Sequence, residues 1–362
     1  MPSCDSPTLV CEHQPQLPVI DGHGVGVTVV NFNTSAYTAH CIASLAMAHT
    51  PPARILVLDN GSSAEAFDAL IRSVEALPRT HLLIYRSEQN LGFACGSNFL
   101  VDRLREWDGC CYVGLLNNDA QAEPIWTDAL VAALQANPGL HGMAGGRMHK
   151  LRNTSEVDTL GISIYGSLMP ADRLRTDDLY MGPTGGCCLM TRACVEDIIA
   201  ETGYFFDPRF FCYCEDTDLV LRANLLGYQP AYVDELVAVH AGQASSSVRK
   251  AGFIAYHGWR NVMWLHVKLI PTTIFLRHAH WLLLAHAMSL GRYVVTGQFG
   301  FVWRVYRDAF RLVPVVLKER VALKPRWRIR PAELDHRICQ SFYRQGYILK
   351  TLRQLIGRGE PA

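Results

Sequence analysis

The sequence predicts an α/β fold in which a mixed, mostly parallel sheet is flanked by helices. Apolar runs of strand length occur at residues 25–32, 55–60, 81–87 and 111–119, and segments with helical periodicity separate them. This alternation is typical of a parallel sheet with helices on both faces. Asn and Asp residues close several of the runs. Because ligands bind beyond the carboxyl ends of strands in such sheets, these residues are candidates for a binding site.

The segments between the strands carry the signals of helices. Thr34 can cap a helix that begins directly after it, because Ser and Thr favour the N-cap position. Two further helices are expected over residues 65–77 and near 94–105. Strand and helix thus alternate three times before the fourth apolar run.

Charge is distributed unevenly along the 362 residues. Residues 1–249 contain 15 Lys and Arg against 28 Asp and Glu, whereas residues 250–362 contain 19 against 5. The basic back half indicates an anionic surface as its surroundings. We predict three segments: a disordered lead over 1–24 without the features of a secretory signal, an α/β domain over 25–250, and a helical, basic, membrane-associated region over 251–362.

The C-terminal region is rich in aromatic residues. Its longest apolar run, residues 281–290, is about half of the roughly 20 residues that a membrane-spanning helix needs. Trp259, Trp264, Trp281 and Trp303 recur along it, and Trp rings favour the headgroup level of a bilayer. We expect helices that lie on an anionic membrane surface without crossing it. The alternative is an ordinary helical appendage with a basic face.

The first strand ends carry a candidate nucleotide site. The segment VVNFNT contains Asn31 and Asn33, and VLDNGSS presents Asp59 before a Gly-Ser turn. A carboxylate at such an edge can accept hydrogen bonds from a base N–H or from ribose hydroxyls. Alternatively, Asp59 caps the next helix. The segment NLGFACGSN begins with Asn90 and places Gly92 before a helix, where the backbone can approach a ligand closely.

A third cluster, LLNNDA, contains a candidate metal ligand. Asn117, Asn118 and Asp119 directly follow an apolar strand. One carboxylate is sufficient in principle, because Mg²⁺ takes one or two carboxylates and leaves other positions to water and phosphates. The alternative is a turn before the helix that follows Pro124.

The most specific cluster is FFCYCEDTDLVLRANLLGY, residues 210–228. Glu215, Asp216 and Asp218 place three carboxylates within four residues, which is costly in a partly buried site. Acidic residues at a helix start also complement the helix dipole, so a structural role is the alternative. His240 follows downstream in VAVHAGQASS.

These clusters, in this order, resemble recurring motifs of family-2 glycosyltransferases with the GT-A fold, especially the bacterial rhamnosyltransferase-like members. The resemblance includes TGGCCLMTR, residues 184–192, and runs from about residue 25 to 245. It implies a Rossmann-like GT-A domain that transfers a sugar from a nucleotide diphosphate donor. The likeness favours dTDP-rhamnose as donor and a saccharide or polyprenyl-linked saccharide as acceptor, in the synthesis of O-antigen or another cell-surface polysaccharide.

The resemblance also implies roles for individual residues. Asp216 corresponds to the catalytic base, and Glu215 and Asp218 to residues that shape the acceptor pocket or tune that base. Asp119 corresponds to a metal-binding Asp. His240, 24 residues after Asp216, corresponds to a His that ligates the metal, Mg²⁺ or Mn²⁺, in several relatives. The implied donor-binding residues are Asn31, Asn33, Asp59, Asn90, Gly92, Asn118, Gly185 and Gly186.

The implied reaction is a single displacement with inversion at the anomeric carbon. A carboxylate removes the proton of the attacking hydroxyl, and a divalent cation stabilises the leaving diphosphate. Asn117 stands where the family often has a first Asp, which leaves Asp119 as the carboxylate ligand. We expect the enzyme to be held peripherally at the cytoplasmic face of the inner membrane, with no nucleic-acid partner.

Three other classes of protein fit the sequence less well. A nicotinamide-dependent oxidoreductase places its glycine fingerprint after the first strand, whereas Gly22, Gly24 and Gly26 precede the first strand or open it. A non-catalytic membrane-associated scaffold would not need the acidic clusters. A processive synthase usually has a QxxRW motif and several spanning segments, and the sequence contains neither.

Overall fold

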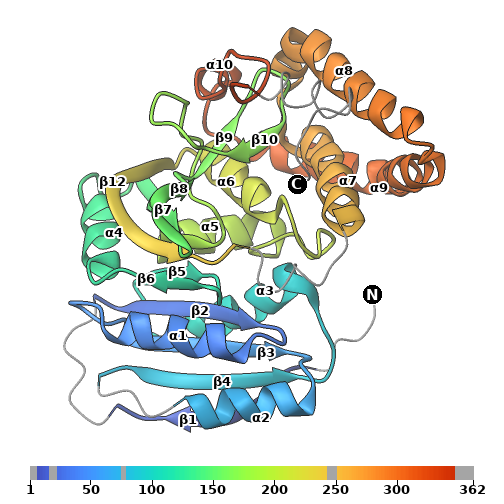
Figure 1. The fold of residues 1–362 in the computed structure, drawn as a ribbon. Coiled ribbons are helices and arrows are strands. Elements are labelled where there is room, and N and C mark those ends of the chain that lie inside the picture. Colours follow the sequence, from blue (N-terminus) through green and yellow to red (C-terminus); the bar gives the residue numbers. More distant parts are fainter. Residues whose placement is uncertain (1–5, 16–22, 75–78, 243–250, 347–362) are drawn as a thin grey trace.

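A ten-stranded mixed sheet forms the centre of the computed structural model, which describes residues 6–15, 23–74, 79–242 and 251–346 (Figure 1). The strand order is β1-β4-β3-β2-β5-β11-β7-β12-β6, and β8 pairs with β7. A separate two-stranded sheet joins β9 and β10. The strands are β1 (Thr8–His13), β2 (Val25–Asn31), β3 (Arg54–Asn60), β4 (His81–Ser87), β5 (Tyr112–Leu116), β6 (Ala120–Ala122), β7 (His141–Lys150), β8 (Asn153–Thr159), β9 (Ile162–Ile164), β10 (Pro170–Asp172), β11 (Cys187–Thr191) and β12 (Gln229–His240).

The parallel part of the sheet is the part that the apolar runs predicted. Strands β4, β3, β2 and β5 run parallel to one another. Strand β11 pairs antiparallel with β5 and with β7, which makes the sheet mixed, as expected. Strand β5 ends at Leu116, earlier than the predicted run over 111–119, so residues 117–119 form a turn beyond the strand.

The N-terminal segment corrects the prediction of a disordered lead over residues 1–24. Thr8–His13 form β1, which pairs antiparallel with β4 at the edge of the sheet. Most of its side chains are exposed, so the sequence lacks the alternating apolar pattern that reveals a half-buried strand. Backbone pairing with β4 holds it instead, together with a contact of 2.7 Å between Glu12 Oε1 and His81 Nε2. Residues 1–5 and 16–22 of the predicted lead lie outside the described residues.

Helices cover both faces of the sheet. Ile55 and Val57 of β3 belong to the core that contains α1, α2 and α4. Leu56 and Leu58 of the same strand belong to the core that contains α3, α5 and α6. Successive residues of a strand point to opposite faces, so β3 is apolar throughout because both faces are buried. The helices are α1 (Ser35–Ala46), α2 (Ala64–Ser73), α3 (Gly92–Arg105), α4 (Trp126–Gln135), α5 (Arg192–Thr202) and α6 (Glu215–Leu225).

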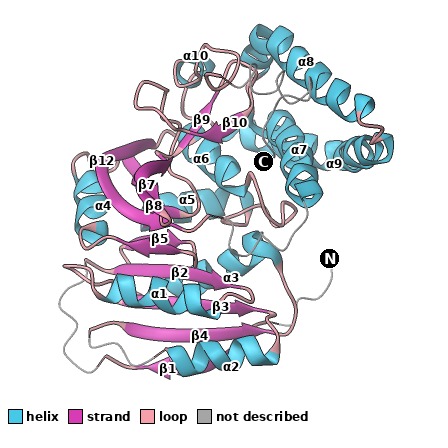
Figure 2. Cartoon of the chain, in the orientation of Figure 1, coloured by secondary structure: helices cyan, strands magenta, loops and turns pink. Residues whose placement is uncertain are grey.

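The C-terminal helices share a hydrophobic core with the α/β domain. Leu265 and Leu269 of α7 and Leu282 of α8 are buried in the cluster that contains α3, α5 and α6. In Figure 2 these helices gather on one side of the molecule, away from β1 and β4. Within the described residues, every helix is too short or too polar to cross a membrane. The C-terminal helices are α7 (Ala251–Leu269), α8 (Thr272–Val295), α9 (Phe299–Leu323) and α10 (Pro331–Asp335), with a 3-10 turn at Lys324–Arg326.

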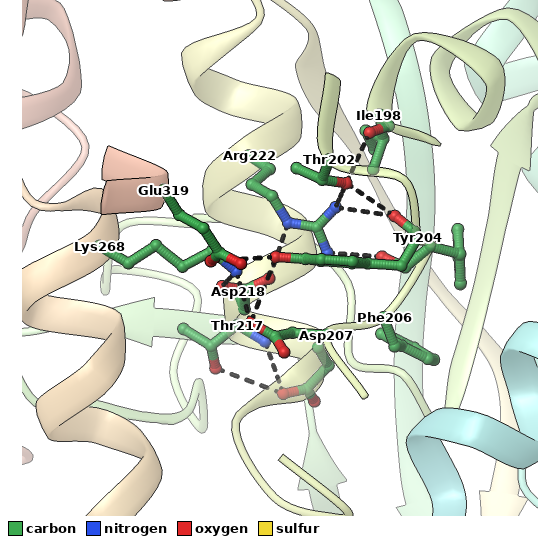
Figure 3. A network of polar contacts seen from close by, with 12 residues as sticks. Ile198, Thr202, Tyr204, Phe206, Asp207, Thr217, Asp218, Arg222, Lys268 and Glu319 are labelled. Carbon is green, nitrogen blue, oxygen red and sulfur yellow. Dashed lines mark hydrogen bonds and ion pairs between the residues drawn. The ribbon is translucent and has the colours of Figure 1, made fainter. Parts of the chain in front are cut away.

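A buried network of ion pairs joins α7 to α6 (Figure 3). The ammonium of Lys268 lies 2.8 Å from Asp218 Oδ1 and 2.8 Å from Asp207 Oδ2, and its side chain is 0% exposed. Arg222 Nε donates to Asp218 Oδ2 over 2.7 Å. Burial lowers the pKa of Lys268, but Asp218 and Asp207 outweigh that effect and raise it, so the ammonium stays charged. These charges compensate one another where water is excluded.

Replacing Lys268 by Met should lower the free energy of unfolding by about 3–5 kcal/mol, because Asp207 and Asp218 lose a buried cation. Lys318→Met is the matched control, since Lys318 lies exposed on α9. Chemical denaturation of both variants at neutral pH measures the difference. A loss at Lys268 below about 1 kcal/mol, the size typical of an exposed pair, would mean that the network does not hold α7 to α6.

Candidate active site

A cavity of about 870 Å³ lies beyond the carboxyl ends of β2, β3 and β5. Its size falls within the range of cavities that bury small-molecule ligands. Residues from both sheets, α6, α7 and the C-terminal segment contribute to its wall. The predicted site residues that line it are Asn90, Gly92, Asn118, Asp119, Gly185, Gly186, Glu215, Asp216 and His240.

Three predicted donor-binding residues are not among the described residues that line this cavity: Asn31, Asn33 and Asp59. Asp59 is 0% exposed, and its Oδ1 accepts a hydrogen bond from Asn31 Nδ2 over 2.8 Å. Asn33 Oδ1 accepts a hydrogen bond from the backbone N–H of Ser63. These residues tie the ends of β2 and β3 together. Asn60, one of the polar residues at the predicted strand ends, follows Asp59 and reaches the cavity.

Asp218, a predicted catalytic residue, also lies outside the cavity wall. Its side chain is 0% exposed, and both of its oxygens are occupied by Lys268 and Arg222. A carboxylate that already compensates two buried cations cannot accept a substrate proton without breaking the network. The three acidic residues therefore divide into one structural residue, Asp218, and a pair at the cavity, Glu215 and Asp216.

Asn60 holds the loop that follows β4. Its Oδ1 accepts a hydrogen bond from Leu91 N over 2.9 Å, and its Nδ2 donates to Gly92 O over 3.1 Å. Gly92 has a φ of +81°, and a Cβ there would lie 2.5 Å from a ring atom of Phe211. Glycine is required because the backbone is left-handed and the ring is in contact. The loop thereby packs directly on the segment that precedes the acidic pair.

Asp216 faces the cavity and is oriented by backbone groups. Gly185 N donates to its Oδ2 over 3.2 Å, and Thr217 N donates to its Oδ1 over 2.7 Å. Burial raises the pKa of Asp216, while these hydrogen bonds oppose part of the rise. A carboxylate whose pKa is raised towards neutral pH is a better general base than a free one.

Glu215 lies beside Asp216 in a different environment. It is buried, and its Oε2 has no hydrogen-bond partner among the described residues. Burial and the charge of Asp216 raise the pKa of Glu215 to about 8. Glu215 is therefore mostly protonated at neutral pH. Because the charge of Asp216 contributes to the raised pKa of Glu215, the two neighbouring carboxyl groups are suited to different roles.

The segment before the acidic pair is strained, and α7 holds it in place. Phe211, Tyr213 and Cys214 have φ values of +64°, +67° and +67°. Residues other than glycine rarely adopt such a conformation, and it persists only where the surroundings enforce it. Asn261 Nδ2 of α7 donates to three backbone carbonyls of residues 210–213, over 2.8–3.1 Å. The C-terminal region thus shapes the loop that presents Asp216.

The two predicted metal ligands, Asp119 and His240, are neighbours in the cavity. His240 Nε2 lies 3.0 Å from Asp119 Oδ1, and His240 Nδ1 lies 2.8 Å from Asp158 Oδ2. Burial lowers the pKa of His240, but the two carboxylates outweigh that effect and raise it to about 10. Among the described residues, no three His, Cys, Asp or Glu side chains form a complete metal site. A cation here would need phosphate oxygens or water as further ligands.

Sequence reasoning missed several charged residues of the cavity. Lys150, Arg152 and Asp158 come from the β7–β8 hairpin, Asp172 from β10 and Arg344 from the C-terminal segment. These residues belong to none of the predicted motifs, and none of them lies at the carboxyl end of a predicted parallel strand. No local signal could have found them, because contacts distant in sequence bring them to the cavity.

A sheet with a parallel core and an acidic pair beside a large cavity at the strand ends is the arrangement of an α/β enzyme. The chain belongs to glycosyltransferase-like family 2, whose family model matches residues 23–252. It is therefore a transferase, and the predicted family is confirmed.

Comparison with individual proteins agrees with the family. The chain is 26% identical over 255 residues to N-acetylglucosaminyl-diphospho-decaprenol L-rhamnosyltransferase of Mycobacterium tuberculosis, over 64% of this chain and 80% of that protein. It shares its fold with a mannosyltransferase from Pyrobaculum calidifontis in complex with GDP-Man and Mn²⁺ (TM-score 0.50, 16% identity, 83% of this chain and 85% of that chain). GalNAc-T7 with UDP, GalNAc and Mn²⁺ is a second such structure (TM-score 0.53, 12% identity, 92% and 58%). The predicted GT-A fold is thereby confirmed.

Glu215→Gln should stabilise the protein increasingly as the pH rises. The pKa of Glu215 is about 8 in the folded state against 4.5 without the protein environment. Wild type therefore loses stability as the pH rises from about 4.5 to 8, and the uncharged Gln does not. We expect a gain above about 1 kcal/mol at pH 8.5 and little gain at pH 5, since one pKa unit corresponds to about 1.4 kcal/mol.

Denaturant unfolding of both proteins at the two pH values measures this difference. Glu88→Gln is the control, because Glu88 is exposed on the loop after β4. An equal effect of Glu215→Gln at pH 5 and pH 8.5 would show that Glu215 is ionised in the folded protein at both.

Proposed function

We propose that this family-2 enzyme is an inverting glycosyltransferase whose catalytic base is Asp216. The observation that supports it most is the place of Asp216 on the cavity wall, beside Glu215, whose pKa burial and the charge of Asp216 raise to about 8. Backbone N–H groups of Gly185 and Thr217 fix the carboxylate in one orientation. A base that is already positioned does not have to be ordered during the reaction.

In the proposed reaction, an acceptor hydroxyl enters beside Asp216 and gives its proton to the carboxylate. Its oxygen attacks the anomeric carbon of the donor as that proton leaves. The bond from this carbon to the diphosphate breaks in the same step, and the nucleoside diphosphate departs. Attack and departure on opposite faces of the sugar give inversion without a covalent intermediate.

Asp119 and His240 are the proposed ligands of a Mg²⁺ or Mn²⁺ ion bound with the donor diphosphate. Such an ion supplies positive charge for the leaving diphosphate. The surroundings of His240 would suit a ligand: a bound cation would replace the Nε2 proton that faces Asp119, while Nδ1 would keep donating to Asp158. A carboxylate behind a ligating His fixes its tautomer and its orientation. Mn²⁺ accompanies the nucleotide sugar or nucleotide in the two solved structures named above.

The proposed donor is dTDP-rhamnose, and the proposed acceptor is a saccharide linked to a polyprenyl diphosphate. The mycobacterial relative, matched over 80% of its length, is named for rhamnosyl transfer to such an acceptor. The process in which this reaction takes part is then the synthesis of a cell-surface polysaccharide such as O-antigen.

The proposed location is the cytoplasmic face of the inner membrane, with peripheral attachment through the turn between α8 and α9. We call this surface the hairpin tip and define it by Arg292, Val295, Phe299, Trp303 and Arg304. Val295 is 77% exposed, Phe299 61% and Trp303 70%. A contiguous group of exposed apolar side chains indicates an interaction surface. The two Arg residues suit an anionic leaflet, where each basic residue contributes about 1 kcal/mol.

Asp216→Asn should lower the transfer rate at least about 100-fold, because the amide cannot accept the hydroxyl proton. Binding of the nucleoside diphosphate should stay near wild type, since the two side chains have nearly the same shape. Asp68→Asn, an exposed change on α2, is the control. Transfer assays and calorimetric titration of the same preparations provide both values. Near-normal transfer by Asp216→Asn would place the base elsewhere, with Glu215 as the next candidate.

Asp119→Ala and His240→Ala should each remove most of the gain in nucleoside diphosphate affinity that Mn²⁺ provides. Asp158→Asn should reduce that gain by about 10- to 100-fold, as expected for a residue that orients a metal ligand. Asp172→Asn is the control, because Asp172 lines the cavity on the separate two-stranded sheet. Calorimetric titrations with and without Mn²⁺ measure these effects. A normal Mn²⁺ effect in His240→Ala would return His240 to a structural role.

Phe299→Ser combined with Trp303→Ser should reduce recovery of the protein with anionic vesicles in a flotation experiment. Added salt should release the wild-type protein in part, because it screens the Arg charges. Leu276→Ser is the control: Leu276 is 68% exposed on α8, but about 27 Å along the helix from the tip. Equal flotation of all three proteins, or of wild type on neutral and anionic vesicles, would contradict attachment through the tip.

A further inference from the structure

A second cavity, of about 390 Å³, lies between α7, α8 and the chain near residues 167–170. It adjoins the active-site cavity, because Pro170, Cys214 and Gly258 line both. Its volume also falls within the range of ligand cavities. We call it the tail cavity. The sugar transfer derived for Asp216 does not use it, so its presence needs a separate explanation.

The wall of the tail cavity differs in chemistry from the active-site cavity. Whereas the active-site cavity carries several carboxylates, Arg292 is the only charged residue among the described residues on the wall of the tail cavity. The Trp259 ring stacks on the Tyr293 ring with 5.6 Å between their centroids. The apolar side chains of the wall include Met169, Val262, Ala285 and Met288. Apart from Arg292, Ser167 and Ser289, mainly apolar and aromatic residues form the described wall, and such a surface suits an apolar chain.

The tail cavity also leads towards the hairpin tip. Arg292 and Tyr293, on the last turn of α8, line it. The next residues, Val294 and Val295, are 45% and 77% exposed. An apolar chain that leaves the active site at Gly258 can therefore pass between α7 and α8 and emerge at the exposed apolar surface. Arg292 stands where the chain would leave the protein.

We propose that the tail cavity binds the first isoprene units of a polyprenyl tail while the acceptor sugar lies beside Asp216. This inference rests on the proposed function, because only a lipid-linked acceptor carries a polar head and an apolar tail in one molecule. Each part then contacts a surface of matching polarity. The sugar lies in the polar active-site cavity, and the apolar tail lies in the tail cavity. Continuity of the two cavities at Gly258 lets one molecule occupy both.

Gly258→Leu tests this by placing a side chain at the junction. A Cβ at Gly258 meets no atom within 4 Å, so the added side chain enters open space, and Leu favours the helix more than Gly. Gly252→Leu is the matched control: Gly252 lies on the same helix with equally open space, but lines neither cavity. Ser289→Trp, on the α8 wall, fills the tail cavity independently.

Two acceptors are compared: N-acetylglucosaminyl diphosphate with a polyprenyl tail in detergent micelles, and the same head group with an ethyl group instead. In Gly258→Leu and in Ser289→Trp we expect the KM for the polyprenyl acceptor to rise at least about tenfold. In Ser289→Trp, whose position lines the tail cavity alone, the KM for the ethyl acceptor should stay within about twofold of wild type. Gly252→Leu should match wild type with both acceptors.

The outcomes separate the tail cavity from the proposed function. Transfer by wild type to neither acceptor overturns the proposed function, and the tail cavity loses its ligand with it. Transfer to both acceptors, with an unchanged KM for the polyprenyl acceptor in either folded variant, overturns the tail cavity alone. Equal KM values of the wild-type protein for the two acceptors would also overturn the proposal that the tail cavity binds the polyprenyl tail. Thermal unfolding of each variant establishes that it is folded.

Discussion

Lys268 is a fully buried ammonium, and a charge in that position requires anions in contact with it. Its partners, Asp207 and Asp218, belong to the loop before α6 and to α6 itself. Helix α7 must therefore dock at this one place on the α/β domain. Asn261, two turns earlier on α7, then reaches the carbonyls of the strained loop. The loop that presents Asp216 is consequently a product of both parts of the chain.

The same network explains how three carboxylates can coexist at the start of one helix. Asp218 is compensated by Lys268 and Arg222, Glu215 avoids its charge by keeping a proton, and Asp216 is stabilised by backbone N–H groups. Like charges at this separation could not all be ionised without compensation. Of the three, Asp216 is the carboxylate at the cavity that the proposed reaction uses as its base.

Helix α7 also connects the polar and apolar regions of the molecule. Gly258 lies where the two cavities join, and Trp259 forms part of the apolar wall. The C-terminal helices are thus part of the site, although their composition suggested a region separate from it. On the proposed function, chemistry at Asp216 takes place close to the membrane surface because α7 and α8 provide both the wall of the site and the path to the hairpin tip.

The sequence by itself determined the parallel strands β2 to β4 and the helices between them, because periodicity and turn chemistry are local properties. It also placed Asp119 beyond a strand end and Gly92 and Asp216 at helix starts. Tertiary structure alone decided which of the predicted residues reach the cavity. Asp218 and Lys268 are 50 residues apart, and Asp158 and His240 are 82 apart. Which partner a charged side chain contacts depends on such distant contacts. The local sequence does not distinguish a carboxylate that faces a buried ammonium, as Asp218 does, from one that faces a substrate cavity, as Asp216 does.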